Sequence, residues 1–353
     1  MKLLFLTKYT ALGASSRMRT FQYLRHYEAA GIDCTVSSFF NDAYLHNLYG
    51  GKPSRWSLFN FYMKRFLVFF TVFKYDKVYI EKEIFPYSPP FAEWLLFLSG
   101  KDYLVDYDDA IFHNYDRNSN FFIRTFLENK IDIVMKHAEV VIAGNSYLAK
   151  RAEKAGAKKV IIVPTVVDLE RYVPSAESTK GRKFIIGWIG TKTTFEKHLL
   201  SIKDWLLKAQ DLFDLEIHII GITENDVFLG DHVKYVPWTA ETEVEAICKI
   251  DVGIMPLRHS PWEEGKCAYK IIQYMACGKP VIASNVGVNA EMCLNGDTGF
   301  LADTEEEFLE ALHFLINNKM SGENMGKKGR ALVEKSFNIE KTSKKMAELI
   351  LGK

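Results

Sequence analysis

Residues 262–291, WEEGKCAYKIIQYMACGKPVIASNVGVNAE, contain in succession a loop, a helical segment and a short apolar strand. The apolar residues of 268–276 recur at helical spacing, and PVIAS at 280–284 is typical of a strand buried inside a parallel sheet. A helix followed by a buried strand is the repeating unit of α/β proteins. The stretch therefore indicates an α/β fold in which helices cover a parallel sheet.

The same alternation extends along the chain in both directions. The polar segment 164–183 carries two prolines, Ser and Gly, interrupts the alternation and is the best candidate for a linker. We therefore predict two Rossmann-like domains, at 1–165 and 166–335, followed by a helix at 336–353. Strands are predicted at 3–6, 77–80, 103–105, 140–142, 160–163, 184–190, 216–220, 233–236, 252–256 and 280–284. Helices are predicted at about 17–30, 195–209, 241–249, 270–277 and 339–351.

The bulk composition fits two globular domains. Of 353 residues, 48% are apolar and 25% charged, and the net charge of +1 gives no electrostatic reason to expect a nucleic acid partner. The five cysteines lack the close spacing of zinc or redox motifs, which fits reduced thiols in a cytoplasmic protein. The N-terminal residues MKLLFLTKYT predict a first strand, because their apolar run is too short for a signal peptide.

Three residues of the helix at 266–273 suit a phosphorylated ligand. Lys266, Lys270 and Gln273 are spaced by four and three residues, which predicts that they share one helical face. A helix N-terminus favours anions, two lysines add to that, and the Gln273 amide suits ribose hydroxyls. The alternative is an ordinary solvated helix face.

A second ligand-binding candidate is the turn after the strand FIIGWIG at 184–190, where Gly190, Thr191 and Lys192 lead towards a helix. Open α/β sheets bind ligands at such strand ends, where a glycine lets the backbone approach a diphosphate and Lys192 neutralises it. The alternative is plain turn chemistry.

Polar residues of the first domain are candidates for binding a second substrate. In DYDDAIFH at 106–113, Asp108 and His113 are predicted to orient the hydroxyls of a substrate and Asp109 to act as a base, the alternative being a polar loop that caps the next helix. Near the N-terminus, Gly13 provides a turn, Ser15 and Ser16 are candidate helix caps, and Arg17 and Arg19 could clamp an anionic substrate. The alternative places both arginines on the surface of an amphipathic helix.

Several of these segments together resemble family 4 glycosyltransferases, which are retaining enzymes with the GT-B fold. The resemblance rests on YMACGKPVIAS (274–284), NGDTGFL (295–301), PTVVDLERY (164–172), FIIGWIGT (184–191), SSRMRTFQYLRHYEAAGI (15–32) and NSYLAKRA (145–152). It implies two domains facing across a cleft, with the helix at 336–353 packed back on the first. It also implies a nucleoside diphosphate-sugar as co-substrate, no other cofactor and no metal.

The chain departs from the family's Glu-x7-Glu pair. The second Glu falls on Gln273 and the first on Gly265, with Glu264 one residue earlier. We expect Glu264, Asp109 and Lys270 to be catalytic. We expect Gly190, Thr191, Lys192, Lys266, Lys270 and Gln273 to bind the donor, and Gly13, Arg17, Asp108 and His113 to bind the acceptor.

The segment 54–77 is aromatic and basic. Between residues 52 and 77 there are six Lys or Arg and one acid, and Lys64 and Arg65 interrupt the apolar run, so that it will not span a bilayer. One interpretation is an amphipathic helix on an anionic membrane surface, at the inner face of the cytoplasmic membrane. The other is a core helix with its basic residues on the wet side.

The predicted function is therefore transfer of a sugar from a nucleoside diphosphate-sugar to a saccharide or lipid-linked glycan, with retention of configuration. Two alternatives stay open. A sugar-nucleotide epimerase of the same fold would turn over the donor without an acceptor, and a non-catalytic nucleotide- or glycan-binding relative would show no turnover.

Overall fold

The computed structural model describes residues 1–50, 55–175, 181–223 and 229–352, without the side chains of 48–50 and 55–57. Internal contacts divide the chain into two compact units. The first unit comprises Met1–Thr165, Glu264–Cys267 and Ile339–Lys353, and the second comprises Val166–Glu263 and Ala268–Asn338. The sequence analysis places the domain boundaries after residues 165 and 335, whereas in the structure they fall after residues 165 and 338, and residues 264–267 join the first unit.

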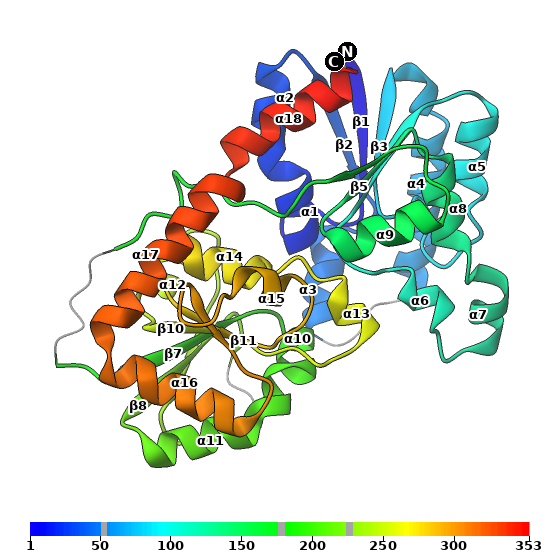
Figure 1. Ribbon diagram of the computed structural model, residues 1–353. Helices are drawn as coiled ribbons and strands as arrows, with labels where there is room; N and C mark the ends of the chain where they lie inside the picture. The colour runs from blue at the N-terminus through cyan, green and yellow to red at the C-terminus, as the bar shows by residue number, and fades with distance from the viewer. Residues whose placement is uncertain (51–54, 176–180, 224–228, 353) are drawn as a thin grey trace. The chain divides into compact units, whose positions relative to one another are not determined.

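The first unit is a six-stranded sheet in the order β2-β1-β3-β4-β5-β6, with every strand pair parallel (Figure 1). Its strands are β1 (Lys2–Thr7), β2 (Asp33–Ser38), β3 (Lys77–Glu81), β4 (Tyr103–Tyr107), β5 (Val140–Ala143) and β6 (Val160–Ile162). Its helices are α1 (Ala14–Arg19), α2 (Leu24–Ala29), α3 (Asp42–Gly50), α4 (Arg55–Phe69), α5 (Phe91–Leu98), α6 (His113–Asp116), α7 (Phe121–Leu127), α8 (Lys130–His137), α9 (Ser146–Lys154) and α18 (Ile339–Leu351).

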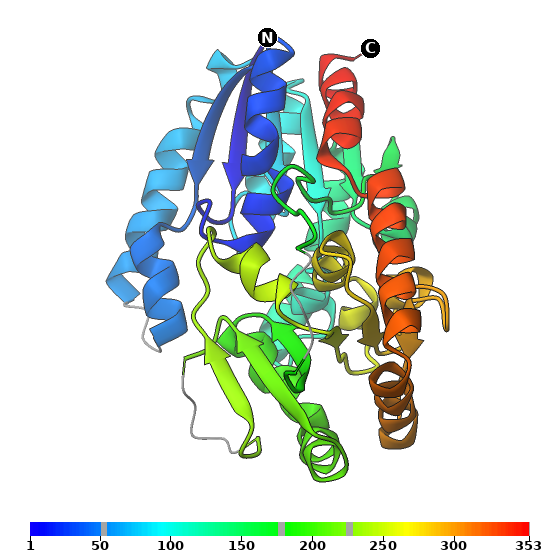
Figure 2. The ribbon, with the colours of Figure 1, turned by 90° about the vertical axis from the view of Figure 1, so that its left-hand side faces the viewer.

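The second unit is also a six-stranded parallel sheet, in the order β12-β11-β10-β7-β8-β9 (Figure 2). Its strands are β7 (Phe184–Ile189), β8 (Leu215–Ile220), β9 (Val233–Val236), β10 (Val252–Met255), β11 (Val281–Ala283) and β12 (Gly299–Leu301). Its helices are α10 (Lys192–Lys197), α11 (Lys203–Leu212), α12 (Glu243–Cys248), α13 (Pro261–Glu264), α14 (Tyr269–Ala276), α15 (Val288–Met292), α16 (Glu305–Asn317) and α17 (Lys319–Ser336).

These sheets confirm the predicted α/β class with two Rossmann-like domains, and every predicted strand is present. The central strands β4, β5 and β10 are buried along their whole length, as expected for parallel strands covered by helices on both faces. The predicted last helix is α18, which packs against α2 within the first unit (Figure 1).

Two predicted helices are each broken into shorter pieces. The helix expected at 17–30 ends at Arg19, because Thr20 takes non-helical backbone angles (φ −127°, ψ −64°), and resumes as α2 after a turn of 3-10 helix. The helix expected at 195–209 is divided in the same way into α10, a 3-10 turn and α11.

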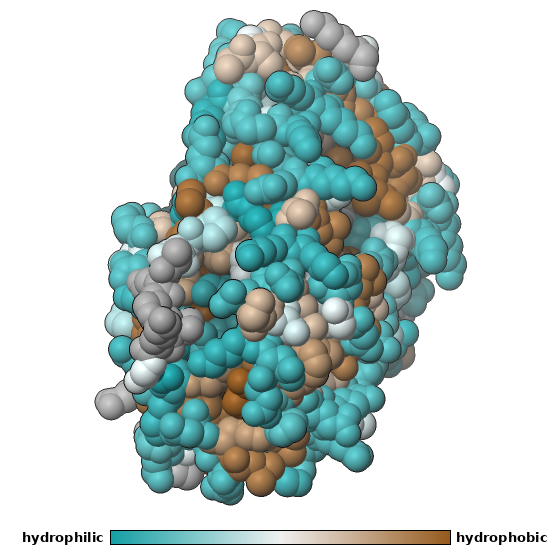
Figure 3. All heavy atoms as spheres, turned by 60° about the vertical axis from the view of Figure 1, so that its left-hand side comes forward, coloured by the Kyte–Doolittle hydropathy of each residue, from teal (hydrophilic) through white to brown (hydrophobic). Residues whose placement is uncertain are grey.

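Hydrophilic side chains predominate on the face drawn in Figure 3. No helix of the described ranges combines the length and apolar character needed to cross a bilayer.

One buried ion pair ties three parts of the first unit together. The Arg19 guanidinium donates from Nε and Nη2 to the two carboxylate oxygens of Asp106 at 2.8 and 2.5 Å, and from Nη1 to the carbonyl of Val163 at 2.8 Å. Both charged side chains are almost fully buried. Arg19 therefore serves the fold, and neither of its expected positions, as an acceptor clamp or a surface residue, is correct.

We expect Arg19→Met to lower the free energy of unfolding by about 3–5 kcal/mol, because Asp106 would be left buried without its counter-charge. The control is Lys77→Met. Lys77 pairs with Glu139 at 2.7 Å, but both side chains are partly exposed, so the change should stay within about 1 kcal/mol. Denaturant titration followed by circular dichroism measures both, and equal losses would contradict the assignment.

Candidate functional site

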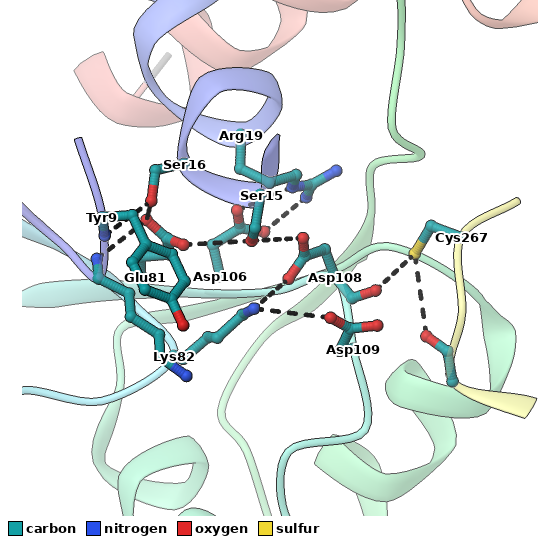
Figure 4. A network of polar contacts seen from close by, with 12 residues as sticks. Tyr9, Ser15, Ser16, Arg19, Glu81, Lys82, Asp106, Asp108, Asp109 and Cys267 are labelled. Carbon is teal, nitrogen blue, oxygen red and sulfur yellow. Dashed lines mark hydrogen bonds and ion pairs between the residues drawn. The ribbon is translucent and has the colours of Figure 1, made fainter. Parts of the chain in front are cut away.

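Polar side chains of the first unit gather where neighbouring strands end (Figure 4). The connections from β1 and β3 run to opposite sides of the sheet, so the ends of these strands form a topological switch point, the usual ligand position in open α/β sheets. Glu81 ends β3, Lys82 follows it, and Asp108 follows β4. The first candidate site is this polar cluster, made of Ser15, Ser16, Glu81, Lys82, Asp108 and Asp109.

Glu81 is a buried carboxylate that accepts two hydrogen bonds and lies close to a third polar group. The Ser16 hydroxyl donates to its Oε2 at 2.6 Å, the Lys8 backbone N–H donates to the same oxygen at 3.1 Å, and the Ser15 hydroxyl lies 3.1 Å from Oε1. Burial raises the pKa of Glu81, although Lys82 opposes this. The two serines therefore do not cap α1 as predicted. Gly13 occupies the N-cap position, and the serine hydroxyls face the strand ends.

Lys82 is a buried cation that the sequence analysis missed. Its φ of +69° is uncommon for a residue with a side chain, and its Nζ lies 2.9 Å from Asp108 Oδ1 and 3.7 Å from Asp109 Oδ2. Burial alone would lower the pKa of Lys82, but Asp108, Asp109 and Glu81 outweigh it and raise the pKa. The charged triplet Glu81–Glu83 directly after a buried strand was the available signal, the same kind that singled out residues 106–109.

Asp108 and Asp109, both predicted site residues, differ in exposure. The side chain of Asp108 is 13% exposed and accepts a 2.5 Å hydrogen bond from Ser15. Burial would raise the pKa of Asp108, but Lys82 and Ser15 outweigh it and lower the pKa to about 2. Asp109 is 30% exposed and lies 3.9 Å from Lys266 Nζ, so it is the more accessible carboxylate.

The prediction that Lys266 shares a helical face with Lys270 and Gln273 is wrong. Helix α14 begins only at Tyr269, after Ala268 with φ +50°, and residues 264–267 belong to the first unit. Packing explains this, because a Cβ on Gly265 would lie 2.5 Å from that of Ala110. The segment is also fixed by the thiol of Cys267, which donates to the Asp108 carbonyl at 3.2 Å, and by Asn145, which donates to the Lys266 carbonyl at 3.1 Å. Lys266 therefore lies beside the polar cluster, and Glu264 is held by the same segment.

The other predicted acceptor residues lie outside the polar cluster. Both ring nitrogens of His113 are engaged, Nδ1 with Asp116 at 2.8 Å and Nε2 with the Tyr147 hydroxyl at 2.9 Å. Arg17 points its Nη1 towards the carbonyls of Ala11 and Leu12, each at 3.5 Å. Gly13 permits close packing, because a Cβ there would lie 2.5 Å from that of Tyr9. Their acceptor-binding roles stay predictions.

The second unit has its own switch point, between β7 and β10. Gly190 follows β7, and a Cβ there would lie 2.5 Å from the Trp188 ring and 2.7 Å from Thr194 Oγ1. Thr191 and Thr194 form a capping box at the start of α10, while Lys192 is exposed, 4.0 Å from Glu196. The structure thus gives Gly190 a packing role besides the predicted approach to a diphosphate.

Lys270 and Gln273 both lie on α14 but in different environments. The Lys270 ammonium lies over the ring of Trp188, 5.4 Å from its centroid, at the end of β7. Gln273 is buried, and its amide donates to the Tyr172 hydroxyl at 2.8 Å. Tyr172 in turn donates to Glu243, which also accepts from the Trp238 indole at 2.6 Å. This buried network fixes the position of Gln273. The sequence analysis did not predict it, although the segment 164–172 that contains Tyr172 contributed to the family resemblance.

Glu263 is a further residue that the sequence analysis did not select. Its buried carboxylate lies 2.5 Å from Lys197 Nζ and 3.6 Å from His198, and it accepts from the Ser260 hydroxyl. Burial would raise the pKa of Glu263, but Ser260 and Lys197 outweigh it and lower the pKa. The adjacent residues Glu263 and Glu264 therefore have different surroundings. Glu263 forms a buried ion pair with Lys197 in the second unit, whereas Glu264 belongs to the first unit.

No three His, Cys, Asp or Glu side chains are grouped as a metal site in the described parts of the chain.

Residues 183–318 match a family model described as "Glycosyl transferases group 1". Two curated relatives match about half of the chain. A Bacillus subtilis protein, TuaH, whose name assigns it to teichuronic acid biosynthesis as a glycosyltransferase, is 27% identical over 45% of this chain and 43% of its own. An uncharacterised 41.2 kDa protein of the Klebsiella pneumoniae cps region is 31% identical over 49% of this chain and 50% of its own. The chain thus spans about half the length of the curated relatives it matches.

Solved structures resemble the whole chain. Sucrose-phosphate synthase of Thermosynechococcus elongatus has a TM-score of 0.75 at 15% identity, covering 100% of this chain and 98% of its own. HepE of Anabaena, in complex with UDP and glucose, has a TM-score of 0.74 at 16% identity, covering 100% of both chains. The predicted resemblance is confirmed in two respects: residues 183–318 match a glycosyltransferase family model, and the whole chain has the fold of GT-B glycosyltransferases. The stretch 183–318 carries the group 1 signature.

Lys82 should control the pH dependence of stability. In the wild type the depressed pKa of Asp108 favours the folded state above pH ~4, and this contribution of about 2 kcal/mol is lost as the pH falls towards 2. In Lys82→Met burial acts on Asp108 without its counter-charge, so its folded pKa should exceed the unfolded value and stability should fall as the pH rises from 4 to 7.

Unfolding free energies measured between pH 3 and 7 test this reversal. Lys82→Arg, which keeps the positive charge, is the control and should retain the wild-type direction. Parallel profiles for Lys82→Met and the wild type would contradict the electrostatic account.

Proposed function

We propose that the chain transfers a sugar from a nucleoside diphosphate-sugar to a saccharide or lipid-linked glycan. The observation that carries this proposal is Lys270 on α14, held over Trp188 at the switch point of the unit that matches the glycosyltransferase model. A cation there could neutralise a diphosphate, the group that gains charge as the sugar leaves. The UDP and glucose bound by HepE, a protein of the same fold, support a nucleotide-sugar donor.

The polar cluster of the first unit suits acceptor hydroxyls. Asp109 is its most accessible carboxylate and is our candidate base, while Lys82 and Ser15 keep Asp108 ionised as a hydrogen-bond acceptor for a sugar hydroxyl. The predicted roles of Glu264, Gln273, Gly190, Thr191 and Lys192 stay part of this proposal. So does donor binding by Lys266, now from its position beside Asp109 and not from a helical face shared with Lys270. The proposal includes retention of configuration, no required metal, and action in the cytoplasm at the inner face of the membrane.

Donor binding is tested by melting temperature. A ligand at a hundred times its dissociation constant should stabilise by about 2.7 kcal/mol, so one of UDP, GDP, CMP or their sugar conjugates should raise the melting temperature. Lys270→Ala should abolish the shift. The control Lys208→Ala, which removes an exposed lysine paired with Glu305, should keep it. No shift with any nucleotide would refute the donor site.

Turnover separates the proposal from its alternatives. With the stabilising donor and a panel of saccharide and lipid-linked acceptors, we expect a new glycoside, with a glycosidic configuration matching the donor, and an undiminished rate in EDTA. Altered donor without acceptor would indicate an epimerase. Binding without any product would indicate a non-catalytic relative, and loss of rate in EDTA would contradict metal independence.

A further inference from the structure

A single hydroxyl group lies between two carboxylates in the polar cluster (Figure 4). The Ser15 Oγ is 3.1 Å from Glu81 Oε1 and 2.5 Å from Asp108 Oδ2. A serine hydroxyl has one proton, so it can donate to only one of these two oxygens. If both carboxylates were ionised, the other oxygen would face the lone pairs of Ser15 with no proton between them, which is repulsive. The two contacts together therefore require a second proton.

The proton of Ser15 belongs to its contact with Asp108. The other oxygen of Asp108, Oδ1, lies 2.9 Å from the ammonium of Lys82, which favours the ionised carboxylate. Burial would raise the pKa of Asp108, but Lys82 and Ser15 outweigh it and lower the pKa to about 2. The contact of Ser15 with Asp108 is also shorter than its contact with Glu81, as is usual for a charged acceptor.

The second proton belongs to Glu81. Its Oε2 accepts from the Ser16 hydroxyl at 2.6 Å and from the Lys8 backbone N–H at 3.1 Å. Its Oε1 has the Ser15 oxygen as its only polar partner among the described residues. Glu81 is 1% exposed, and a carboxylate oxygen buried without a donor is costly. A protonated Oε1 would donate to Ser15, so that both atoms would be hydrogen-bonded.

Charged residues lie on the elements around Glu81: Lys8, Arg19, Arg65, Lys82, Asp106 and Asp108. Arg19 and Asp106 neutralise each other, and the Lys8 ammonium lies over the Tyr9 ring. Lys82 and Arg65 favour the ionised form of Glu81. Lys82, however, contacts Asp108, and Arg65 donates to two backbone carbonyls. Burial and Asp108 favour the protonated form, and the balance raises the pKa of Glu81.

We propose that Glu81 is a neutral carboxylic acid that donates its proton to Ser15 and thereby positions Asp108 for an acceptor hydroxyl. The hydrogen bonds then run in one direction, from Glu81 to Ser15 and from Ser15 to Asp108. An ionised Glu81 would compete with Asp108 for the Ser15 proton. Glu81 is therefore a positioning residue that acts through Ser15. Its effect on the acceptor rests on the proposed function, whereas its protonation does not.

Infrared spectroscopy of the full chain at pH 7 tests the protonation without any substrate. We expect a carboxylic acid C=O stretch that Glu81→Gln removes. Glu263→Gln is the matched control. Glu263 is also buried, but Ser260 and Lys197 outweigh burial and lower its pKa, so its substitution should remove no such band. A spectrum that Glu81→Gln leaves unchanged in this region would overturn the proposal.

The pH dependence of folding is a second test without substrate. An unfolded Glu has a pKa of about 4.3, so above about pH 5 only the folded protein would hold the proton of Glu81. Folding of the wild type should then become about tenfold less favourable per pH unit because of this residue, an effect that Glu81→Gln lacks. The ratio of the variant's folding constant to that of the wild type should therefore rise about a hundredfold between pH 5 and 7 in denaturant titrations. A flat or falling ratio would contradict a protonated Glu81.

Acceptor kinetics test the positioning role. An amide at position 81 can donate to Ser15 while its oxygen accepts from Ser16 and Lys8, so Glu81→Gln should keep the acceptor KM within about twofold. Glu81→Leu cannot donate and should raise that KM about tenfold or more, as should Ser15→Ala, which interrupts the same chain of hydrogen bonds. The rise in melting temperature caused by the donor should stay unchanged in all three variants.

Equal acceptor KM values for Glu81→Gln and Glu81→Leu would refute the positioning role. If no acceptor is turned over although both tests without substrate succeed, the proposed function fails, and with it the acceptor role of Glu81, while its protonation stands.

Discussion

The parallel direction of all strands within each sheet is the constraint on which both candidate sites depend. Because every strand of a sheet ends at the same edge, residues far apart in the chain meet there without any long-range motif. Ser15, Glu81 and Asp108 are brought together in this way in the first unit. Lys270 contacts Trp188 in the second unit for the same reason. Lys270 lies on α14, which connects β10 to β11, and Trp188 lies on the neighbouring strand β7. Charged groups are also buried at these edges, and each of them is stable there only with an opposite charge or a hydrogen-bond partner.

The first unit meets that requirement with a graded set of carboxylates. Asp106 is neutralised by Arg19 and belongs to the fold, whereas burial raises the pKa of Glu81, so that it binds a proton more readily. Lys82 and Ser15 outweigh burial at Asp108 and keep it ionised. Carboxylates whose environments push their pKa values apart are the usual basis for dividing acid, base and binding roles. Asp109, the most exposed of them, is the one that a ligand could reach with the least rearrangement.

The apolar strands were predictable because burial on both faces leaves a continuous apolar run in the sequence. The strand β2 was missed because its sequence, DCTVSS, mixes polar and apolar residues. β2 lies at the edge of the sheet and its side chains are partly exposed, so it does not need a continuous apolar run. Lys266 was misplaced because helical spacing continues through residues 266–273, whereas contacts of Gly265 and Cys267 with residues 108–110 hold that segment outside the helix. Such contacts join positions more than a hundred residues apart, and nothing local to the sequence indicates them. The same holds for Tyr172 as the partner of Gln273.

Arg65 connects α4 with the surroundings of the polar cluster inside the first unit. It lies on α4, is buried, and donates from Nη2 to the carbonyls of Thr7 at 2.8 Å and Ser37 at 3.0 Å, which end β1 and β2. Burial lowers the pKa of Arg65 to about 9. A buried guanidinium destabilises the fold unless it is hydrogen-bonded, so Arg65 depends on its bonds to the carbonyls of Thr7 and Ser37. The next residue after Thr7 is Lys8, whose backbone N–H binds Glu81. Through this single side chain, α4 fixes the ends of β1 and β2 next to Lys8, which binds Glu81 of the polar cluster.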